Sequence, residues 1–206
     1  MKTRPGLPLV KLALVGILPA WLKRIYYRAR GARIGRNVSL GLFTLIDAPS
    51  IELADGAALA PFTIVRCRGP VTIGKRARIN SFVVIDTGRF EIGDDSKIAE
   101  MVAVGGMLSP RSALLIGKRV AIHPHSFLNP TEPIVMEDDA GLATGTYVYT
   151  HGSWRNMLDG FAGTLGADTI KQGAYVGART FIRPGITIGA YSAIGTASVV
   201  TRDIPD

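Results

Sequence analysis

The residues best suited to chemistry lie where a regular six-residue repeat is interrupted. The longest interruption, Val148 to Gly166, reads VYTHGSWRNMLDGFAGTLG and contains His151. Asn129 and Glu132 lie in an earlier interruption, SFLNPTEP. A histidine can take a proton from a hydroxyl near neutral pH, and a polar group beside it can orient the ring. These residues therefore indicate general-base chemistry, with His151 as the base.

The elements that position these residues follow from the repeat. Aliphatic residues recur in triplets with a spacing of six, and Val, Ala, Ser or Thr stands four residues after the first two members of each triplet. This period fits neither an amphipathic helix nor a simple strand alternation, but it suits short strands joined by tight corners, three to a coil. The eight triplets are Ile34, Leu40, Ile46; Leu53, Leu59, Val65; Ile73, Ile79, Ile85; Ile92, Ile98, Val104; Ile116, Ile122, Leu128; Met136, Leu142, Val148; Ile170, Val176, Ile182; and Ile188, Ile194, Val200.

Stacking of the coils is needed for stability. A single coil cannot offset an ordering entropy of about 1 to 2 kcal/mol per residue, so coils about 4.8 Å apart must hydrogen-bond to one another. Glycines that follow an aliphatic residue, such as Gly35 and Gly93, are expected to ease the corners. The sequence therefore predicts an all-β domain of about eight triangular coils over residues 34–206.

Every insertion in the repeat falls after the third member of a triplet. The spacing to the next triplet is eight residues after Val65, twelve after Val104, eight after Leu128 and twenty-two after Val148. One corner of the prism should therefore carry all the loops, including a long loop at residues 150–169. Loops that emerge together from a rigid scaffold are typical of a functional site. Glu132 is expected to orient His151, with Asp86 on the same edge as the alternative.

Residues 1–33 form a basic, apolar segment that we expect to be helical. Residues 1–46 contain nine Lys or Arg and no acid, whereas residues 47–206 contain fifteen basic and sixteen acidic residues, which argues against a nucleic-acid surface on the folded body. The apolar stretch from Leu12 to Leu22 is broken by Pro19 and is too short for a membrane span of about 20 residues. Two alternatives stay open: a helix that covers the end of the body or a partner subunit, or peripheral contact of residues 1–30 with an anionic membrane.

Composition indicates one globular domain in a reducing compartment. An apolar content of 47% allows a sizeable core. The single cysteine, Cys67, cannot form an internal disulfide. We therefore expect a cytoplasmic protein, with association at the inner face of the membrane as the alternative.

The triplets resemble the hexapeptide-repeat acyltransferases, whose pattern is [LIV]-G-x-x-[STAV]-x. The resemblance covers Ile34 to Pro205 and implies a left-handed parallel β-helix. THGSWRNMLDG and the closing IGTASVVTRDIP are similar to the sugar O-acetyltransferase branch. That likeness implies a homotrimer that transfers an acetyl group from acetyl-CoA to a hydroxyl of a sugar or glycan precursor, without a metal. An amino acceptor is the alternative.

The resemblance also implies roles for individual residues. His151 matches the general base, and Asn129 matches an asparagine that binds the acceptor. Tyr175 takes the place of an aromatic residue beside the pantetheine arm, and the backbone N–H of Ala178 matches the oxyanion donor. Thr196, Thr201 and Arg202 match positions that contact the coenzyme arm and phosphates. Apart from the resemblance, the charge of Arg202 or Arg183 could pair with a coenzyme phosphate. The chain lacks the GxPA-like segment that follows DIP in the family, which suggests a longer protein or a partly open coenzyme site.

Two other functions stay open at this point. A non-catalytic structural or assembly module of a larger protein could use the same prism and would not bind acyl-CoA. A prism-shaped class of carbonic anhydrase holds zinc with three histidines at subunit boundaries. This chain has three, but His123 and His125 lie together in IHPHSF, away from the loop corner, and we expect structural or surface roles for them.

Overall fold

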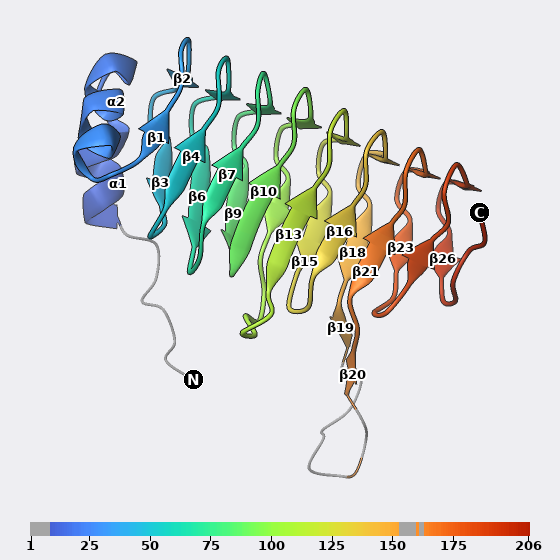
Figure 1. The fold of residues 1–206 in the computed structure, drawn as a ribbon. Coiled ribbons are helices and arrows are strands. Elements are labelled where there is room, and N and C mark those ends of the chain that lie inside the picture. The colour runs from blue at the N-terminus through green and yellow to red at the C-terminus, as the bar shows by residue number, and fades with distance from the viewer. Residues whose placement is uncertain (1–8, 153–159, 161–162) are drawn as a thin grey trace.

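In the residues that the structure describes, the protein is a prism of eight coils with two helices at one end (Figure 1). The computed structural model describes residues 9–152, 160 and 163–206. Each coil contributes one strand to each of three parallel sheets, A, B and C, and neighbouring coils pair in register. Because every coil runs from sheet A to B to C, the prism has an A–B edge, a B–C edge and a C–A edge.

The strands are short, and their order within each sheet follows the coils. Sheet A consists of β1 (Arg33–Ile34), β4 (Ile51–Leu53), β7 (Val71–Ile73), β10 (Arg89–Ile92), β13 (Ala113–Ile116), β16 (Ile134–Met136), β21 (Asp168–Ile170) and β24 (Thr187–Ile188). Sheet B consists of β2 (Ser39–Leu40), β5 (Ala58–Leu59), β8 (Arg78–Ile79), β11 (Lys97–Ile98), β14 (Ala121–Ile122), β17 (Gly141–Leu142), β22 (Tyr175–Val176) and β25 (Ala193–Ile194). Sheet C consists of β3 (Leu45–Asp47), β6 (Ile64–Cys67), β9 (Val84–Thr87), β12 (Ala103–Val104), β15 (Phe127–Asn129), β18 (Tyr147–Tyr149), β23 (Phe181–Ile182) and β26 (Val199–Val200).

The aliphatic triplets form the core of the prism, as the repeat predicts. The first and second members end the strands of sheets A and B, and the third members lie within the strands of sheet C. All of them are buried except Ile34 and Ile194, which are half-buried in the first and last coils. The small polar residues inside the corners stabilise the stack, because the hydroxyls of Thr44 and Thr63 donate to carbonyls of the next coil at 3.1 and 2.9 Å.

The corner glycines were expected to ease the bend of the backbone, but the structure shows that they make room for the next coil. The left-handed backbone conformation lies three residues after the aliphatic residue, and mostly in non-glycine residues such as Asn37 (φ 55°) and Phe62 (φ 61°). The glycine next to the aliphatic residue is needed because the following coil passes close to it. A Cβ on Gly35 would lie 2.8 Å from the Asp55 nitrogen, and one on Gly93 would lie 2.5 Å from the Gly117 oxygen. These glycines therefore permit stacking rather than supply a positive φ.

The helices α1 (Leu9–Gly16) and α2 (Ala20–Ala29) lie across the open end of the first coil (Figure 1). In later coils, the carbonyls that face the helical end accept hydrogen bonds from the N–H groups of the preceding coil. The first coil has no preceding coil, so these carbonyls need other donors, because a buried carbonyl without a hydrogen bond lowers stability. Basic side chains of α2 donate to these carbonyls: Lys23 to Gly41, Arg24 to Val38 at 2.9 Å and Arg28 to Ile34 at 2.8 Å. The helix therefore replaces the missing coil.

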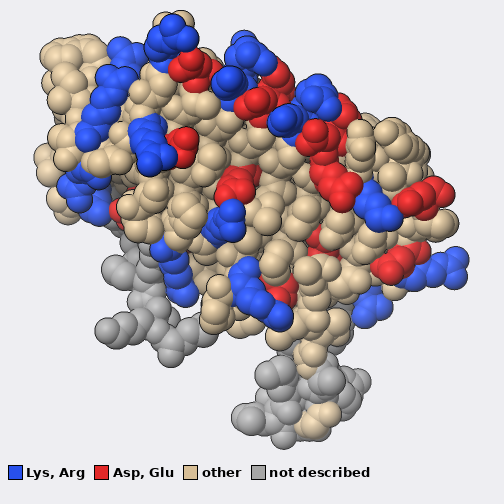
Figure 2. Space-filling view, viewed as in Figure 1, with Lys and Arg blue, Asp and Glu red and all other residues tan. Residues whose placement is uncertain are grey.

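The three edges differ in their chemistry. The A–B edge carries ion pairs between coils, such as Arg76 with Asp95 and Arg119 with Asp139, each at 2.6 Å, and Figure 2 shows basic and acidic side chains alternating along it. The B–C edge carries stacked rings, listed from the helical end as Phe43, Phe62 and Phe82 with centroids 5.2 and 5.1 Å apart. The C–A edge carries the loops.

Candidate active site

The loops gather on the C–A edge, as the insertions predict. Successive loops follow β12, β15 and β18, and the last of them opens with a hairpin of β19 (His151–Gly152) and β20 (Thr164–Leu165) that projects from the prism (Figure 1). Residues 153–159 and 161–162 of the long loop lie outside the described residues. His151 pairs with Leu165 across the hairpin, so its backbone is fixed where the loop leaves the prism.

The imidazole of His151 contacts the hydroxyl of a buried threonine. Its Nδ1 atom lies 2.9 Å from Oγ1 of Thr131, and the same Oγ1 lies 2.7 Å from the carbonyl oxygen of Met107. Met107, Thr131 and His151 come from three successive loops of the C–A edge. One hydroxyl therefore holds together three loops that are far apart in sequence.

Asn129 belongs to the same cluster. Its Oδ1 lies 3.0 Å from Oγ1 of Thr131, and its side chain is buried. Gly106 (φ 138°) passes directly over the amide, and a Cβ there would clash with it. The predicted proximity of Asn129 to His151 is therefore explained by Thr131, which touches both.

Glu132 is buried nearby but is engaged elsewhere. Its carboxylate forms an ion pair of 2.7 Å with Arg111 and lies 3.5 Å from the hydroxyl of Ser109. Its backbone N–H donates to Oγ1 of Thr150 at 2.9 Å, which fixes the loop just before His151. That Glu132 orients the imidazole stays a prediction, and the contact that the structure gives to Nδ1 is the Thr131 hydroxyl.

Asp86 is too far away to be the alternative partner. It lies in β9 of the third coil, whereas His151 follows β18 of the sixth. Three coil spacings of about 4.8 Å separate these strands, which excludes a direct hydrogen bond. Asp86 lies instead 3.6 Å from Arg66 on the adjacent coil. The expectation that Asp86 could orient His151 is wrong, because residues on one edge are in reach of each other only when their coils are neighbours.

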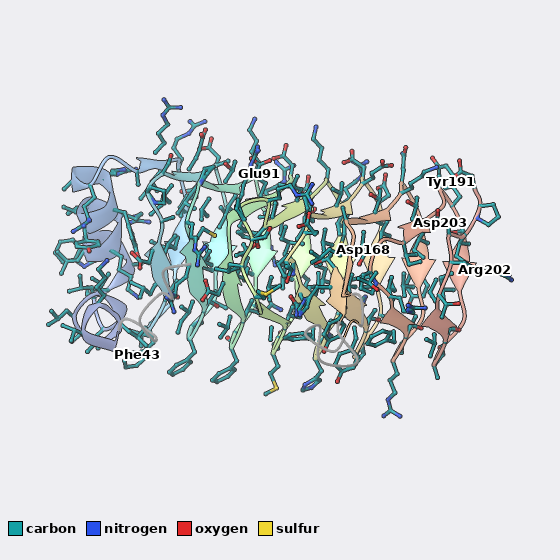
Figure 3. All side chains as sticks on the ribbon, turned by 90° about the horizontal axis from the view of Figure 1, so that it is seen from below. Phe43, Glu91, Asp168, Tyr191, Arg202 and Asp203 are labelled. Atoms are coloured by element: carbon teal, nitrogen blue, oxygen red, sulfur yellow. The ribbon has the colours of Figure 1, made fainter. Side chains whose placement is uncertain are left out.

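The predicted coenzyme residues divide between two edges of one chain. Tyr175, half-exposed on sheet B, lies over Gly141, and Ala178 and Thr196 occupy corners of the B–C edge. The remaining members, Arg183, Thr201 and Arg202, follow strands of sheet C and occupy the C–A edge, with Arg202 at the end remote from the helices (Figure 3). Sheet C therefore separates His151 from Ala178 within a single chain.

The outer surface of sheet C is apolar along the side nearer the B–C edge, from the second coil to the last, whereas Arg66 and Asp86 lie nearer the C–A edge. Its register places these residues in one row: Ile64, Val84, Ala103, Phe127, Tyr147, Phe181 and Val199. We call this row the apolar face. Val84, Tyr147 and Val199 are exposed by 38%, 44% and 65% in the single chain. Equivalent positions of sheet A include Glu52, Thr72 and Glu91. Exposed apolar surfaces of this kind are typical of protein interfaces.

Known proteins resemble the chain along most of its length. It is 28% identical over 195 residues to the bifunctional protein GlmU of Heliobacterium modesticaldum, a match that covers 79% of this chain and 39% of that protein. Shorter stretches are 49% identical to a dTDP-3-amino-3,6-dideoxy-alpha-D-galactopyranose 3-N-acetyltransferase of Aneurinibacillus thermoaerophilus, over 43 residues, and to the galactoside O-acetyltransferase of Escherichia coli K12, over 37 residues. These cover 21% and 18% of this chain, and 22% and 18% of the relatives. These relatives make the chain similar to the hexapeptide-repeat acyltransferases.

The fold of this hexapeptide-repeat protein has a solved counterpart. An Arabidopsis UDP-N-acetylglucosamine acyltransferase superposes with a TM-score of 0.57 over 85% of this chain and 65% of that one, at 18% sequence identity. The expected left-handed parallel β-helix is thereby confirmed. No protein-family model matches the chain. The chain spans about two fifths of the length of the GlmU relative.

The zinc alternative finds no ligand cluster in the described part of this hexapeptide-repeat protein. His123 and His125 lie at a corner of the B–C edge, and His151 lies on the C–A edge. Among residues 9–152, 160 and 163–206, no three His, Cys, Asp or Glu side chains come together in a way that could hold a metal ion.

Two residues of the site region are absent from the sequence prediction. Thr131 stands between Asn129 and Glu132 in the interruption already singled out, so its position was a usable signal. Asp168 gave no signal: it begins β21 directly after the long loop, is buried, and is labelled in Figure 3. Burial raises the pKa of Asp168 to about 8, although the backbone N–H groups of Ile186 and Gly185 oppose this. Its Oδ2 has no hydrogen-bond partner within the described residues.

Proposed function

We propose that the protein transfers an acetyl group from acetyl-CoA to a hydroxyl of a sugar or glycan precursor, with His151 as the general base. The likeness to the hexapeptide-repeat acyltransferases supports the reaction class, and relatives named for O-acetyl and N-acetyl transfer to sugars support the acceptor class. An amino acceptor would use the same base. Because acyl-CoA is a cytoplasmic metabolite, we also propose a cytoplasmic location.

The contact between His151 and Thr131 is the observation that carries this proposal. A threonine hydroxyl can donate one hydrogen bond, and we assign that bond to the Met107 carbonyl, the closest acceptor at 2.7 Å. Oγ1 then accepts from the protonated Nδ1 of His151, and an Asn129 amide turned with its nitrogen toward Oγ1 can donate as well. In this tautomer Nε2 keeps its lone pair. It is the nitrogen that would face the acceptor.

The chemistry needs only this base and an oxyanion donor. Nε2 of His151 takes the proton of the acceptor hydroxyl as the oxygen attacks the thioester carbonyl carbon. The negative charge that develops on the carbonyl oxygen is stabilised by the N–H of Ala178. When the C–S bond breaks, the imidazolium returns the proton to the thiolate. The products are the acetyl ester and free coenzyme A.

A homotrimer would bring the two edges together. If the apolar faces of three chains turn toward a common axis parallel to the prisms, the C–A edge of one chain meets the B–C edge of the next. His151, Arg183, Thr201 and Arg202 would then form one wall of a groove, and Tyr175, Ala178 and Thr196 of the neighbouring chain would form the other. The apolar face, exposed in one chain, supports this arrangement because it would otherwise meet water.

The corner that holds Ala178 permits a sharp test of the oxyanion role. Pro61 and Pro124 occupy the equivalent position, two residues after the aliphatic residue, in the second and fifth coils. Arg179, like Phe62 and His125, follows with a positive φ. An Ala178→Pro chain can therefore keep the corner while losing the N–H. We expect it to fold and to lose about 10²- to 10³-fold in kcat.

Mixed trimers test where the site is assembled. His151→Ala and Ala178→Pro chains, each inactive alone, are refolded together in equal amounts, and release of free thiol from acetyl-CoA is measured with a panel of sugar acceptors. About a quarter of the junctions in random trimers pair an intact His151 with an intact Ala178. Activity should return in the mixture. No return would contradict a site between chains, and no thiol release by the unmodified protein, together with no binding of acetyl-CoA by calorimetry, would favour the non-catalytic module.

A further inference from the structure

We propose that the outer face of the two N-terminal helices binds the surface of an anionic membrane. Five large apolar side chains of α1, α2 and the turn between them point away from the prism and are exposed by more than half: Val10 (74%), Leu14 (66%), Ile17 (57%), Trp21 (56%) and Ile25 (55%). We call these residues the helical end face. Val15 and Tyr27, on the opposite side of the helices, are buried against the first coil.

The helical end face is not needed to cap the prism. The contacts that close the first coil come from Lys23, Arg24, Arg28 and the hydroxyl of Tyr27, which accepts the N–H of Ile46 at 2.8 Å. The sequence left open whether this segment covers the end of the body or touches a membrane. The structure separates the two tasks, because the inner side of the helices makes the cap and the outer side stays apolar.

The charge around the face selects an anionic partner. Arg24 and Arg28 donate to neutral carbonyls, so their positive charges are not compensated by these bonds. Arg30 is exposed, with its guanidinium 5.3 Å from the ring centroid of Tyr26. Residues 1–46 contain no acid, and Figure 2 shows blue side chains beside the tan surface at this end. Cations around an apolar surface with an exposed tryptophan are typical of a helix that lies among anionic headgroups.

A lipid surface explains these features better than a second copy of the chain. Two such faces docked end to end would place the same cations opposite one another, and like charges across an interface are unfavourable. Within the described residues no helix is long and apolar enough to cross a bilayer, so contact would be along the surface. The trimer proposed above would strengthen membrane binding. Rotation about an axis parallel to the prisms keeps all three helical ends on one side, so all three can contact the same membrane at once.

Vesicle flotation with point variants tests the proposal. The unmodified full chain should float with vesicles in which phosphatidylglycerol replaces a third of the phosphatidylcholine, and should stay at the bottom with phosphatidylcholine alone. Trp21→Glu should lower the floated fraction about tenfold, since it places a charge in the apolar contact. Tyr191→Glu is the matched control: Tyr191 is exposed by 75% and lies at the opposite end of the prism (Figure 3). It should float like the unmodified chain.

Point variants are preferable to deletion of residues 1–30, which would also remove the cap of the first coil. Failure of the unmodified chain to float, equal flotation with phosphatidylcholine alone, or normal flotation of Trp21→Glu would overturn the proposal. The proposal would also be overturned if the unmodified chains associated end to end and Trp21→Glu abolished that association, because a second copy of the chain would then be the partner. Flotation does not depend on catalysis, so these outcomes are independent of the proposed acyl transfer.

Discussion

Nδ1 of His151 and Oγ1 of Thr131 lie 2.9 Å apart, across loops that leave two successive coils of the prism. Thr131 is buried and its hydroxyl also reaches the Met107 carbonyl of a third loop. The orientation of the imidazole is therefore set by the stacking of the coils and by a neutral hydroxyl.

Replacement of His151 by alanine should abolish most of the activity and leave the fold intact. Loss of a general base typically costs about 10²- to 10⁴-fold in rate, and we expect kcat for acetyl transfer to fall within that range. Leu165→Ala is the control, because Leu165 pairs with His151 in the hairpin, is exposed by 58% and has no group that transfers a proton. An equal loss in both variants would mean that the hairpin, and not the imidazole, matters.

Thr131 should act as a positioning residue for His151. Thr131→Val keeps the shape but removes the hydroxyl, so kcat should fall about tenfold, equivalent to about 1.4 kcal/mol, with little change in KM for acetyl-CoA. Thr131→Ser should restore the rate. A rise in KM without a change in kcat, or a failure of serine to rescue, would instead indicate a purely structural role.

A charge on the apolar face should disrupt the trimer. Val84 lies on this face in the third coil, far from His151, so Val84→Arg should shift the protein toward monomers in sedimentation velocity and reduce acetyl transfer at the same time. Thr72→Arg, at the outward position of sheet A in the same coil, should change neither quantity. Full activity of a monomeric Val84→Arg protein would show that one chain holds a complete site.

Tyr27 should contribute to stability through one buried hydrogen bond. Tyr27→Phe leaves the N–H of Ile46 without its acceptor, which should lower the free energy of unfolding by about 1 to 3 kcal/mol. Denaturant titration followed by circular dichroism gives this difference. Tyr26→Phe, at the adjacent and partly exposed ring, should cost much less, and similar losses for both tyrosines would assign the effect to ring packing.

Asp168 should make stability decrease as the pH rises. Burial raises its pKa to about 8, so between the ordinary carboxyl range and pH 8 the unfolded chain gives up a proton that the folded chain keeps. The contribution of this group to the free energy of unfolding is therefore full below about pH 4 and falls toward pH 8, with a slope of up to about 1.4 kcal/mol per pH unit.

Asp168→Asn should flatten this dependence, because an amide can accept the Ile186 N–H but does not titrate. Unfolding by denaturant at several pH values provides the measurement. If the variant keeps the full slope between pH 4 and pH 8, another group is responsible.

Much of the fold could be predicted from the sequence for a local reason. A side chain every six residues can face one interior only if the chain turns after each short strand, so the triplets specify the coils and the single edge that carries the insertions. That is why His151, Asn129 and Glu132 were expected on one edge. Asp86 was assigned incorrectly, because it shares the edge with His151 but follows the third triplet, whereas His151 follows the sixth.

The sequence by itself determined the three-sided prism, its core and the edge on which a histidine leaves it, since these depend on spacing along the chain. Only the tertiary structure decided that Thr131 meets the imidazole and that the helices cap with one side and expose the other. These features depend on which side chains of different coils and helices come within hydrogen-bonding or packing distance, and a linear pattern does not contain those distances.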